Sequence, residues 1–342
     1  HNGNHRAVSC VNTSRLMSGI CGLFNLDGSH VAEAELHAMT AMLEHSGPEG
    51  TGTWQDGPVG LGRTLLATTP ELLMERQPVR HAESGCVMTA DVRLDNREEL
   101  HDALEIQRPL DSVGDAELII AAYLAWGEGC PNRLLGDFAF ALWDGRQQQL
   151  FCARDHFGMR PFYYHRAAGK RFLFASDARA VLASPRVPYR INQGRIADFL
   201  VPQLEWIDYT STFFEDVYRL PPGHMAVVTR DRLVIEEYWR PSPGSELGPM
   251  SDDDYREEFL EVFSRAVESR LRAPSAKIGS MLSGGMDSGS VVVVAKDLLG
   301  SAGDSLLKTL SATRRRFDDC AESRAIRAAI AMPSLSPTLV YL

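Results

Sequence analysis

The chain has 342 residues, which at roughly 100 to 200 residues per domain predicts two domains. Hydrophobic residues make up 44% and charged residues 23%, which excludes disorder, collagen and coiled coil as the main architecture. The formal net charge of -10 argues against a nucleic acid or an anionic membrane as the main partner. A small molecule or a peptide fits this charge better.

The six cysteines lie far apart, with no CxxC pair and no companion histidine spacing. This pattern indicates neither a zinc site nor a disulfide framework, and it is typical of a protein in the reducing cytoplasm. No apolar run approaches the roughly 18 residues that a membrane span requires. Residues 1–16 lack an initiator Met and the apolar core of a signal peptide, so we expect them to be a disordered extension without function.

The first domain is expected over residues 17–240. A buried strand is predicted over 20–26, an amphipathic helix over 36–43, and a glycine-rich loop over 47–52. Short apolar segments between turn signals predict further strands at 58–66, 85–94, 136–144, 149–155, 160–166, 170–176, 224–230 and 232–239. Helical patterns lie at 95–104, 116–126 and 177–183. This order predicts stacked antiparallel sheets with helices on their outer faces, an α+β architecture.

A segment rich in proline and glycine, PSPGSELGP, follows Arg240 and is typical of a linker. Beyond it, Ser251 caps a predicted amphipathic helix. A strand over 277–282, a helix over 288–299 and a strand over 306–312 then form one βαβ unit of a parallel sheet. One such unit cannot bury both faces of its sheet, so we expect the domain over 241–342 to be truncated and the chain alone to be inactive as a synthetase.

The segment Ser-Gly-Gly-Met-Asp-Ser over 283–288 lies between the predicted strand and helix. Its glycines let backbone N–H groups approach an anion at the helix N-terminus. The spacing is not that of the Walker loop and no lysine ends it; it resembles the SGGxDS loop of the ATP pyrophosphatases. The resemblance implies that Ser283, Gly284, Gly285 and Ser288 hold pyrophosphate and that Asp287 binds Mg²⁺. The alternative is a serine-glycine turn that only caps a helix.

Sequence blocks in the first domain occur in one order together with LSGGMDS. They are MSGICG from Met17, HSGPEGTG from His45, GDFAFALWD from Gly136, RDHFGMRPFYY from Arg154, FLFASDARAVL from Phe172 and RLPPGH from Arg219. From Met17 to about Ala331 the chain resembles the asparagine synthetase family, which joins a class II glutamine amidotransferase domain to an ATP pyrophosphatase domain. The resemblance implies an Ntn-hydrolase-like first domain. It also implies that Leu282 and Ala312 flank adenine, although core packing alone would demand the same residues.

The family pattern breaks where glutamine is hydrolysed. Ser18 stands where the family has its N-terminal cysteine, and a serine hydroxyl needs a stronger base than a thiol does. The family's Asn-Gly-Glu aligns with Asp91-Val92-Arg93, and its glutamine-binding arginine aligns with Leu65. These changes imply that glutamine hydrolysis was lost and that the domain was kept as a scaffold. Cys21 is no substitute, because it falls inside the first predicted strand.

Asp115 survives from the family's glutamine pocket and would bind an amine there. The alternative is that its side chain is the N-cap of the following helix.

The TTPE segment over 68–71 and the DNREEL segment over 95–100 resemble those of lasso-peptide cyclases and, less closely, of β-lactam synthetase. Those enzymes adenylate a carboxylate with ATP and let an amine attack it. The resemblance therefore implies a Mg²⁺- and ATP-dependent amide synthase that releases AMP and pyrophosphate and uses small-molecule or peptide carboxylates and amines. Two alternatives stay open: a glutamine-hydrolysing asparagine synthase, and a non-catalytic scaffold or fragment.

Overall fold

The computed structural model describes residues 17–201, 203–204, 207–244, 248–274, 278–301, 306–314 and 320–341. The expected extension over 1–16 lies outside these residues. The chain divides into two compact units. The first contains residues up to Ala67 and Met74–Pro241, and the second contains Thr68–Leu73 and residues from Ser242 onward. The TTPE segment over 68–71 thus belongs to the second unit. A single boundary near Arg240 assigns this segment to the first domain.

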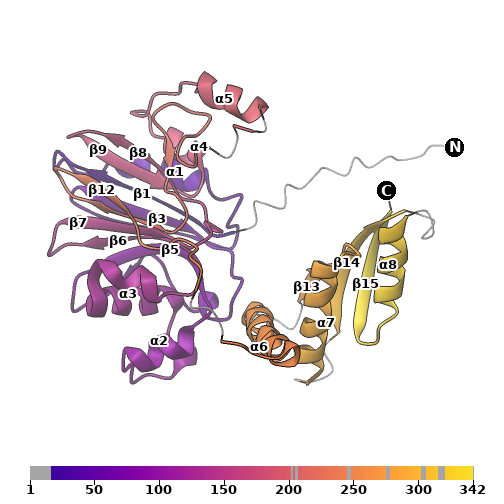
Figure 1. The fold of residues 1–342 in the computed structure, drawn as a ribbon. Helices are drawn as coiled ribbons and strands as arrows, with labels where there is room; N and C mark the ends of the chain where they lie inside the picture. The colour runs from indigo at the N-terminus through magenta and orange to yellow at the C-terminus, as the bar shows by residue number, and fades with distance from the viewer. Residues whose placement is uncertain are drawn as a thin grey trace. The chain divides into compact units, whose positions relative to one another are not determined.

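The first unit contains two six-stranded antiparallel sheets (Figure 1). One sheet has the order β10-β8-β9-β1-β3-β2, with β1 Gly19–Asn25, β2 Thr51–Asp56, β3 Val59–Thr64, β8 Tyr163–Ala167, β9 Arg171–Ala175 and β10 Tyr218–Arg219. The other has the order β12-β11-β7-β6-β5-β4, with β4 Val79–Arg80, β5 Val87–Leu94, β6 Gly136–Asp144, β7 Gln149–Arg154, β11 His224–Val228 and β12 Leu233–Glu237. The helices are α1 Glu33–Ala41, α2 Arg97–Ala103, α3 Asp115–Trp126, α4 Ala178–Leu182 and α5 Gln193–Leu200, with 3₁₀ turns η3 Leu110–Ser112 and η4 Gly127–Arg133.

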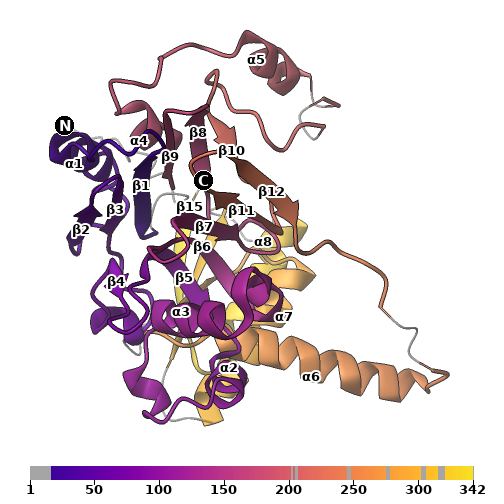
Figure 2. The ribbon, with the colours of Figure 1, turned by 90° about the vertical axis from the view of Figure 1, so that its left-hand side faces the viewer.

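The alternation of side chains along the strands builds three apolar layers. On β9, Phe172 and Phe174 point into the core between the sheets, whereas Leu173 and Ala175 pack toward α1 and α4. The opposite outer layer lies between α3 and the β5–β6–β7 face. Figure 2 shows α1 and α4 beside β1 and β9, and α3 against β5 and β6. The predicted stack of antiparallel sheets with outer helices is confirmed.

Two local predictions in this unit are wrong. The expected loop over 47–52 runs into strand β2, whose Thr51 pairs with Thr64 of β3. The strand expected over 160–166 begins only at Tyr163, because the preceding turn wraps around a buried carboxylate. Asp155 accepts backbone N–H bonds from Phe157, Met159 and Arg160 at 2.9–3.1 Å, which holds this segment out of the ladder.

The second unit carries a three-stranded parallel sheet in the order β13-β14-β15 (Figure 1). Its elements are η2 Glu71–Leu73, α6 Asp252–Arg270, β13 Gly279–Met281, α7 Met286–Ser301, β14 Leu307–Thr313, α8 Ala321–Ile330 and β15 Leu335–Tyr341. Ser251 caps α6, as predicted. The prediction of a single βαβ unit is wrong, because α8 and β15 add a second crossover and a third strand. Strand β15 was not predicted because it contains Pro337, which argues against a strand in the sequence. An edge strand such as β15 tolerates a proline.

One face of this parallel sheet is covered in the described part of the chain. Leu282, Val292 and Leu307 belong to the core that α7 and α6 share with it. On the other face, Met281 and Leu310 are exposed. Within the described residues, no helix is both long and apolar enough to cross a bilayer.

Candidate functional site

The loop that links β13 to α7 runs close to helix α8. Leu282 is buried, and its N–H donates to the carbonyl of Leu310 at 2.9 Å, which places the loop at the C-terminal end of β13. Gly284 has a φ of +81°, and a Cβ there would lie 2.6 Å from the carbonyl oxygen of Glu322. Only glycine therefore allows this approach of loop to helix.

Two serine hydroxyls close this loop upon itself. Ser283 Oγ and Ser288 Oγ lie 2.9 Å apart, and Ser288 Oγ accepts the Ser283 N–H at 3.2 Å. Ser288 Oγ also donates to the carbonyl of Gly285 at 3.3 Å. Ser283 and Gly285 are exposed at the N-terminus of α7. The loop thus presents hydroxyl and amide donors where a helix attracts anions, which suits a phosphate group.

Asp287 is the second residue of α7, and its side chain is exposed. No ion pair or hydrogen bond of its carboxylate is formed with the described residues. The part of the chain that is described holds no group of three His, Cys, Asp or Glu side chains that would cage a metal. A single free carboxylate beside a phosphate cradle fits Mg²⁺, which proteins commonly bind through one or two carboxylates plus the phosphates of the substrate.

Leu282 and Ala312 lie on neighbouring strands, near the C-terminal ends where open parallel sheets bind ligands. Leu282 is part of the core, so packing alone accounts for its side chain. Ala312 is exposed on the other face, so core packing does not account for it.

Ser18, at the position of the family nucleophile, precedes β1 and is buried. Its hydroxyl donates to the carbonyl of Leu66 at 3.2 Å and accepts the Leu66 N–H at 3.0 Å. It lines a small cavity of about 70 Å³ together with His45 and Asp177. His45 Nε2 faces the guanidinium of Arg179 at 3.2 Å and therefore acts as an acceptor there. Within the described residues, the hydrogen bonds of Ser18 Oγ go to backbone and none goes to a base.

Cys21 is fully buried in β1, and its Sγ lies 3.4 Å from Thr40 Oγ1. Burial raises the pKa of the Cys21 thiol to about 12. The thiol is therefore uncharged at neutral pH and is no replacement for the missing nucleophile.

Asp115 is the first residue of α3, and the N-cap is Gly114, so the interpretation of Asp115 as the N-cap is wrong. Its carboxylate accepts the Leu94 N–H at 3.0 Å and forms a salt bridge with Arg97. Arg97 also donates to the carbonyls of Leu110 and Val113 at 2.9 and 2.7 Å. The carboxylate that would bind an amine thus already holds a cation of this chain.

Charged side chains fill one end of the layer between the two sheets. Arg63 follows Val59 and Leu61 on the inward face of β3 and is 3% exposed. Its Nε and Nη2 have no hydrogen-bond partner among the described residues, and burial lowers its pKa. Asp91 of β5 lies 3.6 Å from Arg160 Nη1. Burial raises the pKa of Asp91, and the charges of Arg160 and Arg63 oppose that rise.

Two carboxylates that align with the family's glutamine-binding segments, Asp91 and Asp115, thus face arginines of this chain, Arg160 and Arg97. At Leu65, where the family has an arginine, the backbone N–H donates to the Gly50 carbonyl at 2.8 Å. No sequence pattern assigned a role to Arg63, Glu75 or Arg160, although Arg160 lies in the quoted RDHFGMRPFYY segment. Arg97 was part of the quoted DNREEL segment, but no role was assigned to it.

The Glu75 carboxylate accepts a backbone N–H from the first turn of α3, although Glu75 is distant from this helix in the sequence. Its Oε2 accepts the Ala116 N–H at 2.9 Å, and its Oε1 accepts from Gln77 Nε2 at 2.6 Å. Burial raises the pKa of Glu75, and these hydrogen bonds oppose the rise. A Cβ at Gly114 would collide with the Glu75 carboxylate, so a side chain there would have to displace it. No local sequence signal connects residues that are 41 positions apart.

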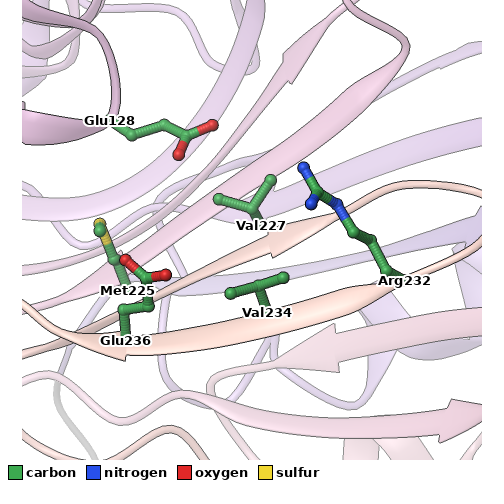
Figure 3. A pocket seen from close by; sticks show the side chains of 6 residues that line it. All are labelled: Glu128, Met225, Val227, Arg232, Val234 and Glu236. Atoms are coloured by element: carbon green, nitrogen blue, oxygen red, sulfur yellow. The ribbon is translucent and has the colours of Figure 1, made fainter.

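Figure 3 shows a pocket of about 90 Å³ on the β11–β12 hairpin. Its lining joins Glu128 of η4 with alternate residues of both strands, among them Val227 and Arg232. In the view, Glu128 and Arg232 extend toward each other across Val227. None of the predicted site residues lines this pocket.

The fold and the loop define a two-unit protein with an ATP-pyrophosphatase-type loop in its second unit. Two family models match the chain: the glutamine amidotransferase domain over residues 17–239 and asparagine synthase over residues 258–335. The chain belongs to the asparagine synthetase family. The architecture of the predicted fold class is confirmed: an α+β domain of stacked antiparallel sheets with outer helices, followed by a parallel-sheet domain.

Three curated relatives span most of the chain. Asparagine synthetase [glutamine-hydrolyzing] 3 of Bacillus subtilis is 29% identical over 299 residues, which are 86% of this chain and 48% of the relative. Amidase chry2 of Gibberella zeae is 30% identical over 81% of this chain and 41% of its own length. Amidase chyE of Penicillium rubens is 28% identical over 90% of this chain and 45% of its own length. The chain thus spans less than half the length of these relatives.

Proposed function

We propose that this chain binds Mg-ATP at the loop over 283–288 as part of a synthase that adenylates a carboxylate and forms an amide without hydrolysing glutamine. The observation that carries the proposal is the contrast between two sites. Ser283, Gly285 and Asp287 are exposed at the N-terminus of α7, whereas Asp115 is withdrawn from solvent and paired with Arg97. The loop over 283–288 is thus accessible to a ligand, whereas the Asp115 carboxylate is already bound by Arg97.

In the proposed reaction, a carboxylate oxygen attacks the α-phosphorus of ATP, and pyrophosphate leaves. An amine nitrogen then attacks the acyl carbon, and AMP leaves with the bonding electron pair. The N–H groups of Gly284 and Gly285 and the hydroxyls of Ser283 and Ser288 hold the departing pyrophosphate. Asp287 holds the Mg²⁺, which when bound offsets charge that develops on the leaving group.

The substrate is proposed to supply the amine itself and not ammonia from glutamine, because neither Ser18 nor Cys21 is activated as a nucleophile in the described part of the first unit. A peptide or small molecule that carries both carboxylate and amine fits this chemistry, as the likeness to the lasso-peptide cyclases implies. We also propose that the TTPE segment acts within the second unit. Its Glu71 Oε1 lies 3.7 Å from Nη1 of Arg272, a residue that follows the end of α6.

A glutamine-hydrolysing asparagine synthase is the second candidate, because several relatives carry that name. Pyrophosphate–ATP exchange separates the candidates when the synthase of which this chain is proposed to form part is assayed with aspartate and with short acidic peptides. We expect exchange that depends on the carboxylate, and amide formation that needs an added amine and not glutamine. Amide formation that depends on glutamine, or release of ADP in place of AMP, would overturn the proposal.

A further inference from the structure

A groove on the first unit, about 320 Å³ in volume, shares no lining residue with the cavity at Ser18. One side of α2, the end of α3 and the η4 turn form its walls. Leu100, Ala103, Trp126 and Leu135 supply apolar lining, and Leu135 is 52% exposed. This volume lies within the range of small-molecule sites.

The side chain of Asn96 ties the two walls of the groove together. Its Nδ2 donates to the carbonyl of Arg133 at 2.9 Å, and its Oδ1 accepts the Leu135 N–H at 2.9 Å. The Asp95 N–H donates to the carbonyl of Leu135 at 2.8 Å. The groove is therefore formed before any ligand arrives, which lowers the entropic cost of binding.

Two opposite charges line the groove without pairing. The guanidinium of Arg133 lies over the Trp126 ring, 4.6 Å from its centroid. Among the described residues, no carboxylate forms an ion pair with it. Glu99 lines the same groove, and its carboxylate contacts the amide of Asn96 at 3.3 Å. A guanidinium that lies over an aromatic ring still offers N–H groups to a planar carboxylate.

We propose that this groove binds a free α-amino acid with an apolar side chain. Arg133 receives its carboxylate, Glu99 receives its ammonium group, and Leu100 and Leu135 contact its side chain. A simple carboxylic acid would leave Glu99 unpaired next to it, and a simple amine would leave Arg133 unpaired. An amino acid is the smallest ligand that matches both charges and the apolar lining.

Calorimetric titration of the full chain with L-leucine, L-methionine and L-phenylalanine tests the proposal. We expect binding of at least one of them, and binding at least about tenfold weaker in Arg133→Gln and in Glu99→Gln, because each loses a charge-assisted hydrogen bond. Arg186→Gln is the matched control, since this exposed arginine lies outside the groove. It should bind as the parent does.

Two analogues check the proposed charge pattern. 4-Methylpentanoate lacks the ammonium group of leucine and 3-methylbutylamine lacks its carboxylate, so both should bind at least about tenfold more weakly than leucine. Circular dichroism and the thermal midpoint verify that each variant folds. Should Arg133→Gln not fold, Arg133→Lys replaces it, with weakened binding expected. No binding of any of the three amino acids at millimolar concentration, or unchanged binding in the Arg133 variant, contradicts the proposal.

Discussion

Arg97 holds the carboxylate of Asp115 in a salt bridge in which the two side chains are only 6% and 1% exposed. The resemblance to the family predicts that Asp115 would bind an amine in a glutamine pocket. The arginine therefore converts a potential substrate contact into an internal structural one.

Removal of this arginine should destabilise the first unit strongly. Arg97→Met leaves the Asp115 carboxylate buried without its cation, which typically costs about 3–5 kcal/mol. Denaturant unfolding followed by circular dichroism measures the loss. The double variant with Asp115→Asn should lose less than the sum of the two single changes, because it removes the unpaired charge.

The control for this experiment is the pair of Arg108 and Glu117, which forms a similar salt bridge with side chains 54% and 40% exposed. Arg108→Met should change stability by about 1 kcal/mol or less. Equal losses in the two arginine variants would show that the Arg97 pair carries no special role.

The first unit should not hydrolyse glutamine. Ser18 lacks a base in the described structure, and Asp115 is engaged by Arg97. Glutamate release is measured with a chain that begins at Ser18. Ser18→Cys alone should not restore turnover, because Asp115 remains paired with Arg97. Robust glutamate release that Ser18→Ala abolishes would show that the site is active.

Gly284→Ala should impair Mg-ATP binding and lower stability, because the new Cβ would meet the Glu322 carbonyl at 2.6 Å on a backbone with positive φ. Calorimetry and the thermal midpoint report the two effects. Gly289→Ala, three residues into α7, is the matched control: no atom lies within 4 Å of the added Cβ. It should stabilise the helix by about 0.5–1 kcal/mol. An unimpaired Gly284→Ala would mean that the loop does not depend on this contact.

Cys320 should be the most reactive of the described cysteines. Hydrogen bonds from the Ser323 side chain and N–H lower the pKa of Cys320, whereas burial raises the pKa of Cys130 to about 12. Because the thiolate is the nucleophile, alkylation of Cys320 should reach half its maximal rate below the ordinary cysteine pKa. Mass spectrometry after timed iodoacetamide treatment at several pH values resolves each site. Ser323→Ala should move the Cys320 profile to higher pH, and an unmoved profile would argue against this hydrogen bond.

Short apolar runs between turn signals predicted most strands of the first unit. Strands such as β6 and β9 have both faces buried and read as continuous apolar runs. The second unit was predicted less completely: Pro337 interrupts β15, and the parallel pairing of Leu307 with Leu335 joins strands through a crossover that no local pattern reveals.

The ATP loop was found because its residues are contiguous, from Ser283 to Ser288. The loss of the family's glutamine-binding residues was predicted from the sequence, but the contacts that the remaining side chains make were not. The sequence showed which family residues were missing, but it did not show that Arg160 faces Asp91 or that Glu75 accepts the Ala116 N–H. Their contacts depend on tertiary packing that spacing along the chain does not encode.

The most direct test of the account is a calorimetric titration of the full chain and of Asp287→Asn with Mg-ATP. The account predicts that the parent binds, and that Asp287→Asn binds at least about tenfold more weakly because the loop over 283–288 loses its carboxylate ligand for magnesium. Asp297→Asn, an exposed change later on α7, should bind as the parent does. Equal affinity of Asp287→Asn and the parent, or no binding by either, would contradict the central claim that this loop holds Mg-ATP.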